Sequence, residues 1–230
     1  MKKISLITLL ACLTIATSAQ SLIPTKFGIK AGLNFSSLSI SSIDGVQPTV
    51  NSSQIGISAG ACIHIPLSDK WYMNPELVYS QKGASFNYDY TQDYNTNNRQ
   101  EYSTTSNLSI AYIELNPTIS YKASHKVSLN AGPSVAFLIS SNNYSYTQDP
   151  TNQHTLSDGE FNEESLDIGL NFGISYYINE NLLIDSKLYT GFMNIGGISR
   201  PIDLKEDPTP NPPAYTLKNR AIVFSLAYLF

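Results

Sequence analysis

The chain has 230 residues, a formal net charge of −4 and 14% charged residues, well below the roughly 25% of an ordinary soluble domain. Its 15 tyrosines outnumber its 14 lysines and arginines taken together. This composition excludes a charge-driven disordered chain and a basic nucleic-acid-binding protein, so no nucleic-acid partner is expected. No internal run of about 20 apolar residues is present that could form a membrane-spanning helix.

The N-terminus has the layout of a secretory signal peptide. A basic start precedes an apolar stretch over residues 4–16, and small residues then lead to a cleavage point after Ala19. We therefore expect a signal peptide at 1–19 and a single exported domain at 20–230. A lipoprotein signal that ends at Cys12 is the open alternative.

Cleavage would change both the charge and the cysteine count. It removes two lysines and no acidic residue, so the net charge goes from −4 to −6. It also leaves Cys62 as the only cysteine, so no internal disulfide can form, and no Cys or His cluster has metal-ligand spacing. An exported chain of this length without disulfides must be held by a large core or by a closed sheet.

The exported part consists of segments in which apolar and polar or small residues alternate. In chain order these segments are 27–35, 55–65, 71–80, 111–121, 127–139, 166–178, 182–192 and 221–230. A soluble strand typically has about 5–6 residues, whereas a membrane-crossing strand needs about 9–11. The length and the alternation together predict an all-β fold, an eight-stranded antiparallel up-and-down transmembrane β-barrel.

The connections between these segments alternate in length. Short turns are expected near 68–70, 123–125 and 179–181, and long polar loops over 39–52, 86–106, 141–164 and 196–216. Outer-membrane barrels place short turns in the periplasm and long loops outside the cell. The chain ends on the aromatic Phe230, which we interpret as the insertion signal read by the barrel insertion machinery. Outer-membrane lipid is the expected surrounding.

The two faces of the predicted strands differ in polarity. One face is almost purely apolar, and the other carries Lys30, Glu76, Lys82, Glu114, Asp167, Asp185 and Lys187. A charged interior is expected when lipid surrounds a barrel. We therefore predict a structural polar network in the lumen, with a proton or ion path as the functional alternative. A soluble lipocalin-like ligand-binding barrel would instead have to pair every one of these charges inside its ligand cup.

Several motifs carry a family resemblance. They are Phe27-Gly28-Ile29-Lys30-Ala31-Gly32-Leu33-Asn34-Phe35-Ser36, the segment 75–83, Tyr112-Ile113-Glu114-Leu115-Asn116-Pro117, Asn130-Ala131-Gly132-Pro133, and Lys218-Asn219-Arg220 with the aromatic end. Together they resemble the PorT-like outer-membrane β-barrel domains of the Bacteroidetes. The family more often has Ile-Pro where this chain has Asn116-Pro117. The resemblance implies the fold and the location. Because its founding member belongs to a gliding-associated secretion system, the resemblance also suggests the alternative role of an accessory subunit in a secretion or uptake assembly.

No catalytic residue, cofactor or metal ligand is predicted, and we expect no enzyme activity. His64 and His125 are expected near the periplasmic end and His154 in an extracellular loop, none of them near another. No Gly-rich phosphate loop, nucleophile elbow or zinc-protease motif is present.

The tyrosines are the best remaining functional candidates. Loop tyrosines that could bind a surface partner are Tyr88, Tyr90, Tyr94, Tyr144 and Tyr146. Trp71, Tyr102, Tyr121 and Tyr177 are assigned instead to the aromatic girdle at the membrane interface. The predicted function is that of an outer-membrane β-barrel with a structural, anchoring or surface-binding role, with a secretion-system or surface protein as the further expected partner.

Overall fold

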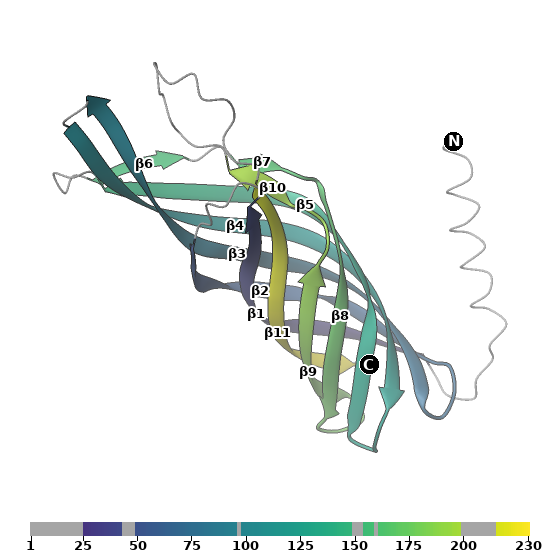
Figure 1. Cartoon of the computed structure of the whole chain (residues 1–230). Helices are drawn as coiled ribbons and strands as arrows, with labels where there is room; N and C mark the ends of the chain where they lie inside the picture. The colour runs from purple at the N-terminus through teal and green to yellow at the C-terminus, as the bar shows by residue number, and fades with distance from the viewer. Residues whose placement is uncertain (1–24, 43–48, 96–97, 149–153, 159–160, 199–214) are drawn as a thin grey trace, which may run out of the picture.

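The computed structural model describes residues 25–42, 49–95, 98–148, 154–158, 161–198 and 215–230. Within them, eight long strands form one antiparallel sheet that closes on itself (Figure 1). These strands are β1 (Lys26–Ser42), β2 (Thr49–Pro66), β3 (Trp71–Asn95), β4 (Asn98–Lys122), β5 (Val127–Gln148), β8 (Leu166–Tyr177), β9 (Leu182–Gly191) and β11 (Tyr215–Leu229). The predicted fold class is confirmed. The predicted signal peptide at 1–19 lies outside the described residues.

The strands follow one another around the barrel in the order β4-β3-β2-β1-β11-β9-β8-β5, and β4 pairs with β5 to complete the ring. Three short strands lie at one end. Here β6 (His154–Asp158) extends the sheet beside β5, and β7 (Phe161–Glu163) pairs with β10 (Gly196–Ile198). Because the sheet is closed, each long strand forms backbone hydrogen bonds with two neighbouring strands. This is required in a membrane, since lipid cannot form hydrogen bonds with an open strand edge. Among the described residues, no helix has the length and apolarity needed to cross a membrane.

The seam between β1 and β11 joins the first and last strands of the barrel. Gly32 makes this close approach possible, because a Cβ atom there would collide with the backbone carbonyl oxygen of Phe224. The amide of Phe230 donates a hydrogen bond to the carbonyl oxygen of Phe27 at 2.7 Å. The ring of Phe230 points outward, 67% exposed, and meets Tyr228 edge to face at 5.3 Å. Its role as the insertion signal stays a prediction.

The predicted loops 86–106 and 141–164 are wrong over much of their length. β3 and β4 have 25 residues each and stay paired as far as Asn95 and Asn98, while β5 runs to Gln148. Figure 1 shows this hairpin extending far beyond the ends of β8 and β9. These segments are polar on both faces, so they show no alternation. They are nevertheless rich in Tyr and Thr, which suit paired strands. The centres of the loops at 39–52 and 196–216 lie outside the described residues.

The three short turns fall at the opposite end, as predicted, together with the start of β1 and the end of β11. We call this the short-turn end, and the other the hairpin end. The turn after β2 is closed by the amide of Leu67, which donates to the carbonyl oxygen of Trp71 at 2.8 Å. In the turn after β8, the side-chain oxygen of Asn179 accepts hydrogen bonds from the amides of Asn181 and Leu182.

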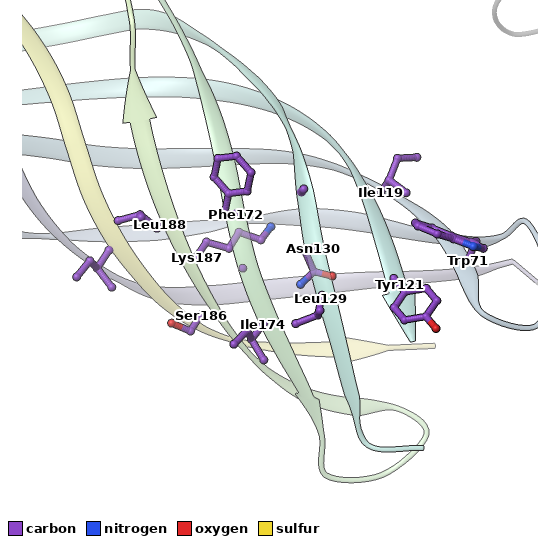
Figure 2. Close-up of a pocket in the computed structure, with 13 residues that line it drawn as sticks. Trp71, Ile119, Tyr121, Leu129, Asn130, Phe172, Ile174, Ser186, Lys187 and Leu188 are labelled. Carbon is purple, nitrogen blue, oxygen red and sulfur yellow. The ribbon is translucent and has the colours of Figure 1, made fainter. Parts of the chain in front are cut away.

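The outward face is apolar on every wall of the barrel. Ile55, Phe137 and Ile174 are each more than half exposed, at 64%, 54% and 54%. Figure 2 shows part of this face, a shallow groove of about 810 Å³ lined in part by Phe172 and Leu188. So large a continuous apolar surface argues against the soluble lipocalin-like alternative.

The aromatic girdle is only partly as predicted. Trp71 and Tyr121 lie outward at the short-turn end with ring centroids 5.0 Å apart. Tyr177 does not belong to the girdle, because it faces the lumen and packs on its core. Tyr102 pairs with Tyr90 along the hairpin, and its side chain is not among those described, so its assignment to the girdle stays a prediction. The outward Tyr176 takes the place predicted for Tyr177, one residue along the strand.

Replacing Leu188 with Arg should lower the free energy of unfolding by about 2–4 kcal/mol, because Leu188 lies midway along the lipid-facing wall. Replacing Leu182 with Arg at the short-turn end of the same strand should cost only about 0–1 kcal/mol. Denaturant titration in lipid vesicles, followed by fluorescence of the single tryptophan, measures both. Equal losses at the two positions would contradict the placement of the apolar face in lipid.

Candidate functional site

The seven charged residues predicted for the lumen all lie on inward-facing positions, each no more than 7% exposed. The structure brings them together in two groups. The central group consists of Lys30, Glu76, Asp185 and Lys187, and the upper group, nearer the hairpin end, consists of Lys82, Glu114 and Asp167. No charged side chain is shared between the groups.

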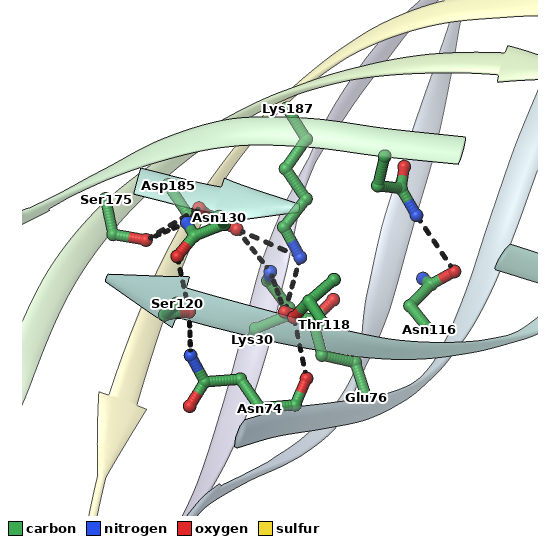
Figure 3. A network of polar contacts seen from close by, with 11 residues as sticks. Lys30, Asn74, Glu76, Asn116, Thr118, Ser120, Asn130, Ser175, Asp185 and Lys187 are labelled. Atoms are coloured by element: carbon green, nitrogen blue, oxygen red, sulfur yellow. Dashed lines mark hydrogen bonds and ion pairs between the residues drawn. The ribbon is translucent and has the colours of Figure 1, made fainter. Parts of the chain in front are cut away.

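The central group is a closed set of ion pairs across the barrel (Figure 3). The Lys30 ammonium donates to the Glu76 carboxylate at 2.9 Å and to the Asp185 carboxylate at 2.7 Å. Lys187 donates to the same Glu76 oxygen and lies 3.4 Å from Asp185. Two ammonium groups thus face two carboxylates, and the group is neutral. Its four members come from β1, β3 and β9.

Neutral polar side chains complete this group, and they were not predicted individually. Asn130 donates to the hydroxyl of Ser175 at 2.6 Å and to Asp185 at 3.2 Å, while Ser175 donates to Asp185 at 2.9 Å. Ser120 in turn donates to the side-chain oxygen of Asn130. Each of these residues stands at an inward-facing position of its strand. The alternation that located the charged residues therefore also locates these amides and hydroxyls.

Asn116 is the residue at which the chain departs from the family motif. It is 4% exposed and accepts a hydrogen bond from the side-chain amide of Asn171 at 3.1 Å. A buried amide without a partner is costly. Asn116 on β4, which differs from the family motif, therefore has a polar partner in Asn171 on β8.

The upper group holds one cation and two carboxylates. Lys82 lies 2.7 Å from Glu114, and its ammonium lies 3.4 Å from the centre of the Tyr189 ring. Such a cation–π contact attracts the ammonium group to the face of the ring. The Tyr189 hydroxyl donates to Asp167 at 2.7 Å, and the Asn219 side chain donates to the same oxygen at 2.9 Å. Neutral donors thus stabilise the second carboxylate.

The inward face is not polar along its whole length, contrary to the prediction. Toward the hairpin end it carries an apolar layer made of Leu38, Ala84, Leu108, Ile110, Tyr112, Ala136, Ile195 and Leu217. Toward the short-turn end it carries a second layer made of Cys62, Leu183, Ala227 and Leu229, with Tyr177 packed against it. The ion pairs therefore lie between two apolar layers.

Ile195 reaches the lumen from the segment between β9 and β10. Its amide donates to the carbonyl oxygen of Leu217 at 2.9 Å, and its own carbonyl accepts from the amide of Glu164 at 3.0 Å. The side chain of Asn194 accepts a hydrogen bond from the Leu217 amide at 2.9 Å. These bonds hold Ile195, 1% exposed, across the lumen at the hairpin end.

The space left around the central group is a cavity of about 30 Å³. One water needs at least about 10–15 Å³ of such volume, so the cavity holds no more than a few molecules. Within the described ranges, no three His, Cys, Asp or Glu side chains are grouped so that they could hold a metal ion. This arrangement can satisfy buried charge, and it offers little room for a ligand.

Two of the three histidines lie closer together than predicted. His64 and His125 both line one hollow at the short-turn end. The sequence placed each at the periplasmic end but could not show that the turn carrying His125 leans over the lumen. His154 begins β6 at the hairpin end, far from both.

The tyrosines proposed for surface binding lie on extended strands. Tyr88, Tyr90 and Tyr94 belong to β3, and Tyr144 and Tyr146 belong to β5. Their backbones lie past the apolar band, in the part of the sheet that extends beyond β8 and β9 (Figure 1). The structure describes their backbone pairing but not their side chains.

A closed barrel of eight strands, apolar outside and filled with paired charges inside, defines an outer-membrane β-barrel protein. The family model described as an outer membrane protein beta-barrel domain matches residues 18–196. The chain therefore belongs to this family, and its location is the bacterial outer membrane. No curated protein matches it.

Three solved structures are similar at low sequence identity. Ail, the attachment invasion locus protein of Yersinia pestis, is 11% identical, with 90% of this chain and 100% of that chain covered and a TM-score of 0.41. Neisserial surface protein A is 12% identical, with 90% and 100% covered and a TM-score of 0.41. OprG from Pseudomonas aeruginosa is 16% identical, with 89% and 95% covered and a TM-score of 0.37.

Replacing Glu76 with Ala should strongly destabilise the barrel. The change leaves two buried ammonium groups with one carboxylate, and breaking a buried ion pair costs about 3–5 kcal/mol. The folded band on a gel should convert to the unfolded band at a lower temperature, and the denaturant midpoint should fall.

Two further variants sharpen this test. Ser225→Ala is the matched control, because Ser225 also faces the lumen and its hydroxyl has no hydrogen-bond partner among the described residues. The double change Lys30→Met with Glu76→Met leaves Asp185 and Lys187 as a neutral pair and should recover part of the loss. If Glu76→Ala changed conductance but not heat stability, the structural interpretation of the network would be wrong.

Proposed function

We propose that this protein is a closed outer-membrane anchor that holds a sheet outside the cell as a binding surface. The proposal rests on one observation, the difference in length between the strands. β8 and β9 have 12 and 10 residues, close to the roughly 9–11 that a membrane requires, whereas β3 and β4 have 25 each. The excess length extends beyond the apolar band at the hairpin end.

The extended part is a sheet and not a flexible loop, which suits a binding surface. β3 and β4 pair without a break from Trp71 and Tyr121 to Asp93 and Arg99, and β4 pairs with β5 as far as Gln148. A surface held by backbone hydrogen bonds loses little conformational freedom when it binds. Tyrosine, which recurs along both β3 and β5, supplies large contact area at low entropic cost.

The filled lumen favours an anchor over a channel. Eight strands enclose an interior that side chains just fill, whereas general porins have about 16–18 strands. Here two apolar layers lie on either side of the ion pairs. An ion crossing the barrel would have to displace Ile195 at one end and Leu229 at the other.

We orient the barrel with the short-turn end in the periplasm and the hairpin end outside the cell, following the general habit of outer-membrane barrels. Export through a cleaved signal peptide at 1–19 is part of the same proposal. A tag placed between Thr96 and Asn97 should be labelled on intact cells, and labelling only after the outer membrane is permeabilised would reverse the orientation.

We also propose that the barrel is of the PorT-like Bacteroidetes type. The motif residues Lys30, Glu76 and Glu114 all face the lumen, as do Asn116 and Asn130. The resemblance therefore concerns the interior of the barrel. The role of an accessory subunit in a secretion or uptake assembly would need a partner surface as well. Co-purification of one partner in a fixed ratio would favour that role.

Shortening the hairpin tests the main proposal. Replacing residues 88–104 with Asn-Gly joins Asn87 to Thr105, which are paired in the full-length chain, through a two-residue turn. The barrel should still fold and show heat-dependent gel migration, because the shortened part lies beyond the apolar band. Cells that display it should lose attachment to glycan-coated and matrix-coated surfaces that the full-length protein supports.

The matched control changes only side chains. Replacing Tyr88, Tyr90 and Tyr94 with Thr keeps the strand propensity of β3 and removes the aromatic rings. We expect attachment to fall at least severalfold with the hairpin intact. If cells with the shortened barrel attached as well as cells with the full-length protein, the proposed binding surface would be wrong.

A further inference from the structure

The short-turn end contains a hollow of about 470 Å³, which we call the vestibule. Its walls are inward-facing residues at the ends of the strands, namely His64, Tyr72, Ser128, Tyr177 and Leu229. Its rim comes from the start of β1, the end of β4 and two turns, namely Lys26, Lys122, His125, Lys126, Ile178, Asn179 and Glu180. The volume is within the range of about 300–1,000 Å³ typical of small-molecule sites.

The vestibule adjoins the cavity around the central group, with which it shares His64, Tyr177 and Leu229. The apolar layer that contains Leu229, with Tyr177 packed against it, lies between the vestibule and the central ion pairs. On the vestibule wall, the rings of His64 and Tyr72 stack with centroids 4.3 Å apart. The hollow therefore has an apolar floor and an aromatic wall, and its lysine and glutamate side chains lie at the rim.

The rim is cationic in a chain whose net charge is negative. Lys26, Lys122 and Lys126 supply three ammonium groups, against one carboxylate from Glu180. Within the described part of the chain, none of the three ammonium groups lies in an ion pair. Lys26 donates to the backbone carbonyl of Glu180 at 3.0 Å. The lining thus carries an uncompensated charge of about +2 without counting either histidine.

We propose that the vestibule binds a phosphate-bearing anion. A phosphate monoester carries about −1.5 to −2 charges and three acceptor oxygens, which matches the excess charge and the three ammonium groups. A carboxylate has one charge and two oxygens, so it would leave cations unpaired. The hydroxyls of Tyr72 and Tyr177 and the ring of His125 are further donors around the same space. The proposal does not depend on which side of the membrane the vestibule faces.

The test uses the full mature chain without a histidine tag, in discs of zwitterionic phosphatidylcholine, with pyrophosphate as the probe. The imidazole NMR signals of His64 and His125 should shift and saturate together, while that of His154 at the hairpin end should not move. Calorimetry under the same conditions should give a single saturable binding event.

Matched lysine variants separate the vestibule from general surface charge. Lys122→Gln with Lys126→Gln should weaken pyrophosphate binding at least tenfold. Lys70→Gln, which removes an ammonium group from the same end of the barrel but outside the vestibule, should change the affinity less than twofold. Lys70 and Lys126 are exposed turn residues, and Lys122 is the partly exposed last residue of β4. Unchanged heat-dependent gel migration is therefore expected for both variants and checks their folding.

The origin of the phosphate is resolved by native mass spectrometry from discs that contain phosphatidylglycerol. A lipid retained by the wild type, lost in the double lysine variant and displaced by pyrophosphate would identify a headgroup as the ligand. Pyrophosphate binding without a retained lipid would identify a free anion. The absence of saturable shifts at His64 and His125, or an equal loss of affinity in Lys70→Gln, would overturn the proposal.

Discussion

The closure of the sheet is the constraint on which the rest of the structure depends. Lipid cannot satisfy an open strand edge, so β1 must meet β11 and β4 must meet β5. Closing a ring of only eight strands leaves a narrow interior. Every inward side chain must then pack against, or bond to, a side chain from another strand. The paired charges, the amide and hydroxyl contacts and the two apolar layers all follow from this confinement.

The central ion pairs bear on the register of the strands as well as on stability. Burying charges is costly, and a well-packed apolar set can be equally stable. A shift of one residue in any strand, however, would turn its inward charges toward lipid. Lys30, Glu76 and Asp185 meet only when β1, β3 and β9 are all in the observed register. A misregistered barrel would leave charge unpaired in a medium that cannot solvate it.

Most of the membrane-embedded fold could be predicted from the sequence, because lipid outside and charge inside impose strict alternation. The same rule located all seven lumen charges. The alternation rule failed where the two faces of a strand do not differ in polarity. The hairpin of β3 and β4 is polar on both faces, so nothing in the pattern distinguished strand from loop. Ile195 could not be found either, since it reaches the lumen from outside the regular strands and its position depends on bonds to Leu217 and Glu164.

Smaller errors came from local breaks in the pairing. Ile139 continued the predicted alternation of β5, but a register shift pairs Ala111 with Ser140 and Tyr112 with Leu138, so Ile139 is left without a partner on β4. Beyond this bulge the faces of β5 are exchanged relative to the sequence pattern. The distance between a strand residue and a turn residue, such as that between His64 on β2 and His125, likewise cannot be obtained from periodicity.

The filled lumen makes the two ends of the barrel chemically independent. At the hairpin end, a sheet continuous with the wall stands outside the apolar band. At the short-turn end, a cationic hollow opens beneath an apolar floor. Because two apolar layers and a neutral set of ion pairs separate them, a ligand at one end has no direct contact with the other. Any coupling between the ends would have to travel through the wall strands. β3 is the clearest route, since it carries Tyr72 in the vestibule, Glu76 in the central group and Lys82 in the upper group before it enters the hairpin.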